Sequence, residues 1–136
     1  MLRIVGLVLG LWALMLPALA KAQDADAIEG VISGQLQAFN DRDVATAFTF
    51  ASPMIKGMFG NPANFGMMVE QGYPMVWNNS DVEFLELKEI NGVLFQRVQM
   101  RDAQGERYVA QYEMIQTPDG WQINGVSIIP APDVGA

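Results

Sequence analysis

The chain has 136 residues, of which 51% are hydrophobic and 17% charged, a balance typical of one globular domain and not of a disordered chain. Its net charge of −7 argues against a nucleic-acid partner and against an anionic membrane surface, because both require clustered Lys and Arg. It contains no cysteine, so no disulfide stabilises it, and no histidine, which removes the commonest general base and metal ligand.

The first 22 residues have the pattern of a secretory signal peptide. Arg3 precedes an uncharged apolar run, Ile4–Leu16, which is followed by a proline and by two small-x-small cleavage sites, the second ending at Ala22. A membrane anchor is the alternative, but the run is shorter than the ~20 residues that a spanning helix needs. We therefore predict that residues 1–22 are removed and that residues 23–136 form one periplasmic or secreted domain. The chain has no lipoprotein cysteine, and no membrane anchor would remain after cleavage.

Helical patterns follow the cleavage site. A first helix is expected with Asp24 or Asp26 as its N-cap, and its buried stripe consists of apolar residues at helical spacing: Ile28, Ile32, Leu36 and Phe39. Asp43 is predicted to cap a second short helix over residues 44–51. Arg42 lies between two aspartates, and we interpret it as part of a surface ion pair beside these caps.

The segment Phe50–Val69 is rich in methionine, phenylalanine and glycine. Ser52–Pro53 and Asn61–Pro62 are typical helix starts, so two short helices are expected on either side of Gly60. The methionines of this segment are Met54, Met58, Met67 and Met68. Thioethers can bind Cu(I), but copper carriers usually add His or Cys, and methionine also fills gaps between helices and a sheet. We therefore interpret these methionines as core and predict no metal site.

Extended patterns dominate the rest of the chain. Tyr73–Trp77 is expected to be extended, and four strands separated by turns follow it: 82–90, 93–101, 106–116 and 121–129. Asn91–Gly92 predicts a two-residue type I′ turn. This turn fixes the first register, with Leu87 opposite Gln96 and Leu85 opposite Val98.

The turn at Asp102–Gly105 fixes the second register, with Leu94 opposite Met114, Gln96 opposite Tyr112 and Val98 opposite Ala110. The two registers agree on one apolar face: Leu85, Leu87, Leu94, Val98, Met100, Tyr108, Ala110, Tyr112 and Met114. The other face is polar, with Arg97 opposite both Glu86 and Gln111. A bulge at Asn124–Gly125 would turn all the large apolar residues of the last strand to the core side: Trp121, Ile123, Val126 and Ile128.

Helices followed by an antiparallel meander predict an α+β domain, with short N-terminal helices packed on a curved four-stranded sheet. With its closing "DGWQINGV", this order resembles the NTF2-like, cystatin-like cone. The run "VISGQLQAFNDRDVATAFTFASPMIKGMFGNPANFGMMV", followed by "YPMV", resembles the bacterial family called domain of unknown function 4864, over essentially all of the mature chain. That resemblance implies an exported single domain and supplies no catalytic residues. NTF2-like relatives often hold a small-molecule pocket, and some are isomerases, cyclases or dehydratases that use an Asp/His pair, whereas this chain has no His.

Gln96 and Tyr112 are expected to face each other on the apolar side of the sheet, where a buried amide and a buried phenol need partners. Either they satisfy each other or a buried water, or they line a cavity beneath the helices and point at a ligand. In the second case, the other residues expected around the ligand are Leu87, Val98, Ala110, Met68 and Trp77, with Tyr73 at the rim.

The leading hypothesis for function is an exported, non-enzymatic domain, monomeric or homodimeric, that binds a small apolar ligand or a partner protein through the cone. The alternative is an NTF2-like acid/base enzyme of the isomerase or cyclase type, which would act through a carboxylate and Tyr112. No catalytic residue, metal ligand or cofactor is predicted, because the sequence has no phosphate loop, zinc spacing, EF-hand loop or nucleophile elbow.

Overall fold

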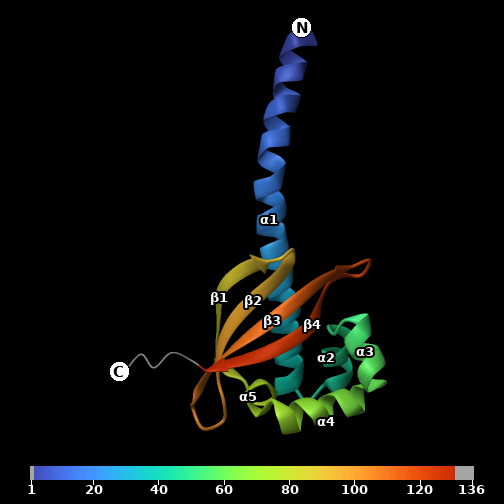
Figure 1. The fold of residues 1–136 in the computed structure, drawn as a ribbon, viewed down its shortest axis with the longest axis vertical. Helices are drawn as coiled ribbons and strands as arrows, with labels where there is room; N and C mark the ends of the chain where they lie inside the picture. Colours follow the sequence, from blue (N-terminus) through green and yellow to red (C-terminus); the bar gives the residue numbers. More distant parts are fainter. Residues whose placement is uncertain (1, 131–136) are drawn as a thin grey trace.

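The computed structural model describes the backbone of residues 2–130 and the side chains of residues 21–130. Within this range, the helices precede the strands (Figure 1). The helices are α1 (Leu2–Asn40), α2 (Val44–Thr49), α3 (Pro53–Phe59), α4 (Pro62–Gly72) and α5 (Pro74–Trp77). The strands are β1 (Ser80–Ile90), β2 (Val93–Arg101), β3 (Arg107–Thr117) and β4 (Gly120–Pro130). No helix in the described part of the chain is long and apolar enough to cross a membrane.

Helix α1 is continuous and longer than expected, so the prediction that a helix begins at Asp24 or Asp26 is wrong. Five of residues 21–27 are alanine, lysine or glutamine, which favour helix, so the helix continues through this segment and needs no cap there. The predicted buried stripe is confirmed, since all four of its apolar residues are buried: Ile28, Ile32, Leu36 and Phe39.

The chain leaves α1 through a short turn that Arg42 and Asp43 stabilise. Asp43 caps α2 as predicted, because its carboxylate accepts a hydrogen bond from the backbone N of Thr46 (3.1 Å). The ion pair predicted for Arg42 is not found among the described residues. Arg42 instead donates to the carbonyl of Trp77 (2.6 Å), and its guanidinium lies 4.3 Å from the centre of the Trp77 ring. This contact attaches the end of α1 to α5.

Residues 74–77 form a helical turn, so the extended conformation predicted for this segment is wrong. Pro74 occupies the first turn of α5, where its fixed φ angle suits a helix. The backbone N of Asn78 donates to the carbonyl of Pro74 (3.0 Å) and closes the turn.

The strands form one open antiparallel sheet in the order β1-β2-β3-β4. The α+β class and the four-stranded antiparallel meander are therefore confirmed. Both turns adopt the predicted conformations: Asn91 and Gly92 have φ angles of 52° and 82°, and Gly105 has a φ of 83°. The pairs Leu87–Gln96, Gln96–Tyr112 and Val98–Ala110 form as predicted.

One pairing differs from the prediction. Phe84, and not Leu85, lies opposite Val98, because β1 contains a bulge between Phe84 and Leu87. Leu85 is consequently exposed, whereas Phe84 packs against the core. The bulge carbonyls of Leu85 and Glu86 accept hydrogen bonds from the side chain of Gln96, and this contact stabilises the irregularity.

The bulge predicted in β4 is present. Glu113 pairs with Gly125 and Met114 pairs with Ile123, so Asn124 is the extra residue. On both sides of the bulge, the apolar side chains of β4 pack against the core, as predicted: Trp121, Ile123, Val126 and Ile128. The second half of α1 lies against one face of the sheet, and α2, α3 and α4 are grouped beside it, next to β4 (Figure 1).

Candidate functional site

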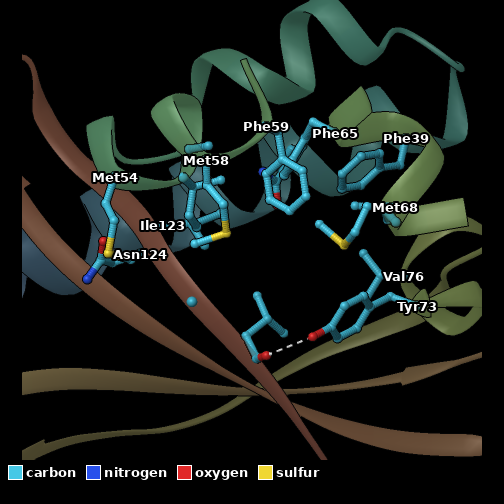
Figure 2. A pocket seen from close by; sticks show the side chains of 16 residues that line it. Phe39, Met54, Met58, Phe59, Phe65, Met68, Tyr73, Val76, Ile123 and Asn124 are labelled. Atoms are coloured by element: carbon cyan, nitrogen blue, oxygen red, sulfur yellow. Dashed lines mark hydrogen bonds between the residues drawn. The ribbon is translucent and has the colours of Figure 1, made fainter. Parts of the chain in front are cut away.

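An apolar cavity of about 270 Å³ lies between α3 and α4 on one side and β4 on the other (Figure 2). The end of α1 contributes to its wall. Its main apolar residues are Phe39, Phe59, Phe65, Met68, Val76 and Ile123. Small-molecule sites are typically such concave, mostly apolar hollows with a few polar groups, so this cavity is the candidate functional site.

Two caps and a glycine position the helices that cover the cavity. Ser52 accepts a hydrogen bond from the backbone N of Ile55 (3.3 Å), and Asn61 accepts one from the backbone N of Asn64 (2.8 Å). Between the two helices, Gly60 has a φ of 82°, which glycine adopts without steric cost. The prediction of two short helices on either side of Gly60 is therefore confirmed.

The segment before α3 is bound to strand β4 by its backbone. Ile123 donates its N–H to the carbonyl of Phe50 (2.9 Å), and Ser52 donates its N–H to the carbonyl of Ile123 (2.8 Å). Ala51 thereby forms a short parallel bridge with Ile123. Because β4 is an edge strand, these bonds use backbone groups that the sheet leaves free. They fix the start of α3 beside β4, on one side of the cavity.

Phe65 of α4 is the centre of an aromatic cluster at the cavity. Its ring centroid lies 6.0 Å from that of Phe39, 5.4 Å from that of Phe48 and 5.9 Å from that of Phe59. These are distances at which tilted and edge-on aromatic pairs attract each other. The cluster joins α1, α2, α3 and α4, and two of its rings, Phe39 and Phe59, stand with Phe65 on the wall (Figure 2).

The methionines of α3 lie at the rim of the cavity. Met54 and Met58 line it although they are 55% and 67% exposed, and Met68 of α4 lines it while half-buried. Met67 is 55% exposed and is not on the wall. The interpretation of these residues as core is therefore wrong for Met54, Met58 and Met67. The physical reason for Met54 and Met58 is that α3 covers the edge of the cavity and keeps much of its surface in solvent, whereas Met67 lies on the exposed side of α4.

The cavity wall has few polar side chains: Gln35, Tyr73 and Asn124. The Nε2 atom of Gln35 donates to the carbonyl of Ala47 (3.1 Å), and the Nδ2 atom of Asn124 donates to the carboxylate of Glu113 (2.7 Å). The Tyr73 hydroxyl donates to a carbonyl of β4 over a long 3.4 Å (Figure 2). The wall residues include no Asp, Glu, Lys or Arg, so the wall is uncharged.

Gln96 and Tyr112 lie opposite each other on the buried face of the sheet. In the described part of the chain, no hydrogen bond joins them. Gln96 donates to the carbonyls of Arg97 (2.9 Å) and Leu85 (3.1 Å), and the hydroxyl of Tyr112 has no partner among the described residues. Complete burial raises the pKa of that hydroxyl above its usual value. Neither residue belongs to the cavity wall.

Of the residues predicted to surround a ligand, Met68 and Tyr73 are on the cavity wall. The others pack elsewhere in the core: Gln96, Tyr112, Leu87, Val98, Ala110 and Trp77. The centre of the sheet is covered, since Val98 and Ala110 have no exposed surface. Trp77 contacts Arg42 and Phe39 instead of the cavity.

Gln35 and Asn124 are wall residues that the sequence analysis did not identify. Gln35 is a polar residue inside the apolar stripe of α1, between Ile32 and Leu36, and that exception was a usable signal. Asn124 occupies the bulge of β4, a type of irregularity that often occurs next to functional sites.

A second hollow of about 400 Å³ lies at the hairpin end of the sheet, beside α1. Its wall includes the carboxylates of Asp24, Glu89 and Glu113. Within it, the indole N–H of Trp121 donates to Asp24 (3.2 Å) and attaches α1 to β4. No group of acidic residues in the described part of the chain has the arrangement of a metal site. The wall of this hollow is more polar than that of the apolar cavity, so the apolar cavity remains the candidate site for a small molecule.

Comparison with known proteins identifies a family and no individual relative. No curated protein and no solved structure matches the chain. The family described as "Domain of unknown function (DUF4864)" matches residues 21–136, which is most of the chain. The chain therefore belongs to the DUF4864 family.

Proposed function

We propose that this protein is an exported domain that binds a small, mostly apolar molecule in the cavity between α3, α4 and β4. The observation that carries this proposal is the cavity itself, of about 270 Å³, with an uncharged and mainly apolar wall. An apolar protein cavity of ~150 Å³ is enough to hold benzene. The cavity therefore has room for a molecule somewhat larger than a single aromatic ring.

The rim supports entry of such a molecule. Met54 and Met58 are flexible, apolar side chains that are largely exposed at the cavity edge. Methionine adapts its shape to a partner and is common at binding surfaces that accept several ligands. Exposing two methionines gains nothing for folding, because their apolar surface stays in water. A bound apolar molecule would remove part of that surface from water, and this burial would contribute favourably to the free energy of binding.

Acid/base catalysis is the other function that the fold allows, but the wall does not favour it. A general acid or base must lie within hydrogen-bond reach of the reacting group. The cavity wall contains no carboxylate, lysine or arginine, and Tyr112 is sealed away from it. The geometry therefore favours binding over proton transfer.

Export is supported by the order of Arg3, the apolar run and the cleavage site that ends at Ala22. The family match begins at Lys21, close to that site. Asp24 is the most N-terminal of the described residues whose side chain forms a hydrogen bond with the sheet. Cleavage after Ala22 would leave this contact in place. The intact mass of the secreted or periplasmic protein tests this: a first residue other than Gln23 contradicts the predicted site.

Binding is tested with the neutral fluorescent probe 1-naphthylamine, whose two fused rings match the room in the cavity, and with a matched pair of variants. Met68→Trp adds volume to the cavity wall, whereas Met67→Trp adds the same volume at the neighbouring, 55% exposed position outside the wall. We expect the wild type and Met67→Trp to bind the probe and Met68→Trp to lose most of the binding. Equal binding by all of these proteins, or by none of them, would contradict the proposal.

A further inference from the structure

Gln35 differs from the other residues of the buried stripe of α1, since it places an amide on the wall of an apolar cavity while being only 3% exposed. Its Nε2 atom donates to the carbonyl of Ala47 (3.1 Å). Because an amide oxygen has no hydrogen to donate to the carbonyl of Ala47, this bond also assigns which end of the Gln35 amide is nitrogen and which is oxygen.

The carbonyl oxygen of Gln35 has no hydrogen-bond donor among the described residues. Within this part of the chain, the fully sealed side-chain oxygens without a partner are those of Tyr112 and Gln122. The Oε1 atom of Gln35 is not one of them, so it retains accessible surface, and the residue to which it belongs lies on the cavity wall. A buried carbonyl oxygen without a donor is destabilising unless another molecule supplies one.

The other polar wall groups are similarly biased toward accepting hydrogen bonds. Asn124 and Tyr73 each donate to an oxygen of the protein, at 2.7 Å and 3.4 Å, respectively. An amide oxygen has two acceptor positions, and a phenol that has donated its only proton can still accept. Unused acceptor capacity therefore exceeds unused donor capacity around the cavity. No positive side chain on the wall could compensate a buried anion.

We propose that the ligand is an uncharged apolar molecule with a hydroxyl group, which donates a hydrogen bond to Oε1 of Gln35. This inference rests on the proposed function and specifies its ligand class. It predicts selection of an alcohol over an ether of equal size, since the ether has no donor. It also predicts rejection of the matching carboxylate, which would be buried without a counter-charge.

The test uses competition with the naphthylamine probe by three compounds: octan-1-ol, its isomer heptyl methyl ether, and octanoate. The variant is Gln35→Met, which conserves the length of the side chain and removes the acceptor. From wild type to variant, we expect the preference for the alcohol over the ether to fall by roughly three- to tenfold, the range for one hydrogen bond. Binding of the ether should persist in the variant and shows that the cavity is intact.

The outcomes separate the inference from the proposed function. If the ether binds and the preference for the alcohol is the same with and without Gln35, the assigned role of Gln35 is wrong. Octanoate that binds wild type as tightly as octan-1-ol overturns the ligand class, and this comparison does not depend on any variant folding. If neither the alcohol nor the ether competes with a bound probe, the inference is overturned while the cavity remains a binding site. If the probe itself does not bind, the proposed function is overturned.

Discussion

Replacing Tyr112 by phenylalanine should stabilise the protein, although Tyr112 is among its most deeply buried side chains. The hydroxyl is sealed from solvent and has no partner among the described residues, so folding removes it from water without compensation. An unsatisfied buried group of this kind costs about 1–3 kcal/mol. Removing one oxygen also leaves a small void, which offsets part of the gain. We expect a net stabilisation of about 1 kcal/mol.

Gln96→Leu should have the opposite effect. The amide of Gln96 donates to the carbonyls of Arg97 and Leu85, at 2.9 Å and 3.1 Å, and these carbonyls would lose their donor. The expected loss of folding stability is about 1–3 kcal/mol, because the side chain of Gln96 binds the carbonyls of the β1 bulge. Gln96 and Tyr112 share no hydrogen bond. The change in the free energy of unfolding of the double variant should therefore equal the sum of the changes in the two single variants within about 0.5 kcal/mol.

Urea denaturation measures all of these changes. With a typical slope of about 2 kcal/mol per molar urea, 1 kcal/mol moves the midpoint by roughly 0.5 M. Tyr73→Phe is the control, since its hydroxyl makes one long bond of 3.4 Å and lies beside the cavity. Its midpoint should change little. A Tyr112→Phe variant that is destabilised by more than about 1 kcal/mol would show that the hydroxyl has a partner, such as a buried water, and would refute this reasoning.

Two further predictions follow from close packing and from burial. A Cβ atom at Gly66 would lie 2.5 Å from Val44, whereas nothing lies within 4 Å of a Cβ atom at Gly57. Thermal melts should therefore show that Gly66→Ala destabilises the protein by about 1–2 kcal/mol. Gly57→Ala should stabilise it by up to about 1 kcal/mol, because alanine favours helix more than glycine does. The raised pKa of Tyr112 means that above pH ~10 the unfolded chain loses a proton that the folded protein keeps. Stability measured by urea should therefore fall as pH rises above ~10, and less steeply in Tyr112→Phe.

The sheet could be predicted largely because its turns are local. Asn91–Gly92 and Gly105 require positive φ angles that few residues adopt, and each turn fixes the register of a whole hairpin. The prediction failed at Leu85, where two adjacent apolar residues allow either one to face the core. The choice depends on a side chain of the neighbouring strand, Gln96, which binds the bulge carbonyls. A pattern within β1 alone does not contain that information.

The cavity could not be predicted because its position depends on long-range contacts. One of the two hypotheses drawn from the sequence placed a ligand above Gln96 and Tyr112, but both residues are buried and neither lies on the cavity wall. The cavity lies to the side, where backbone hydrogen bonds between Phe50, Ser52 and Ile123 attach the start of α3 to the edge of the sheet. Backbone pairing across this sequence distance leaves no periodicity in either segment. Methionines at the rim and in a core also look alike in sequence, because both uses require a flexible apolar side chain.

The bulge in β4 connects the part of the structure that was predictable with the part that was not. It was inferred because Ile123 and Val126, which are an odd number of residues apart, would otherwise point to opposite faces of the sheet. Both residues lie on the cavity wall, with the extra residue, Asn124, between them. A regular strand would therefore remove one apolar wall residue from the cavity and leave no place for the amide of Asn124. The irregularity that keeps the core of β4 continuous is also what gives the cavity its shape and part of its polarity.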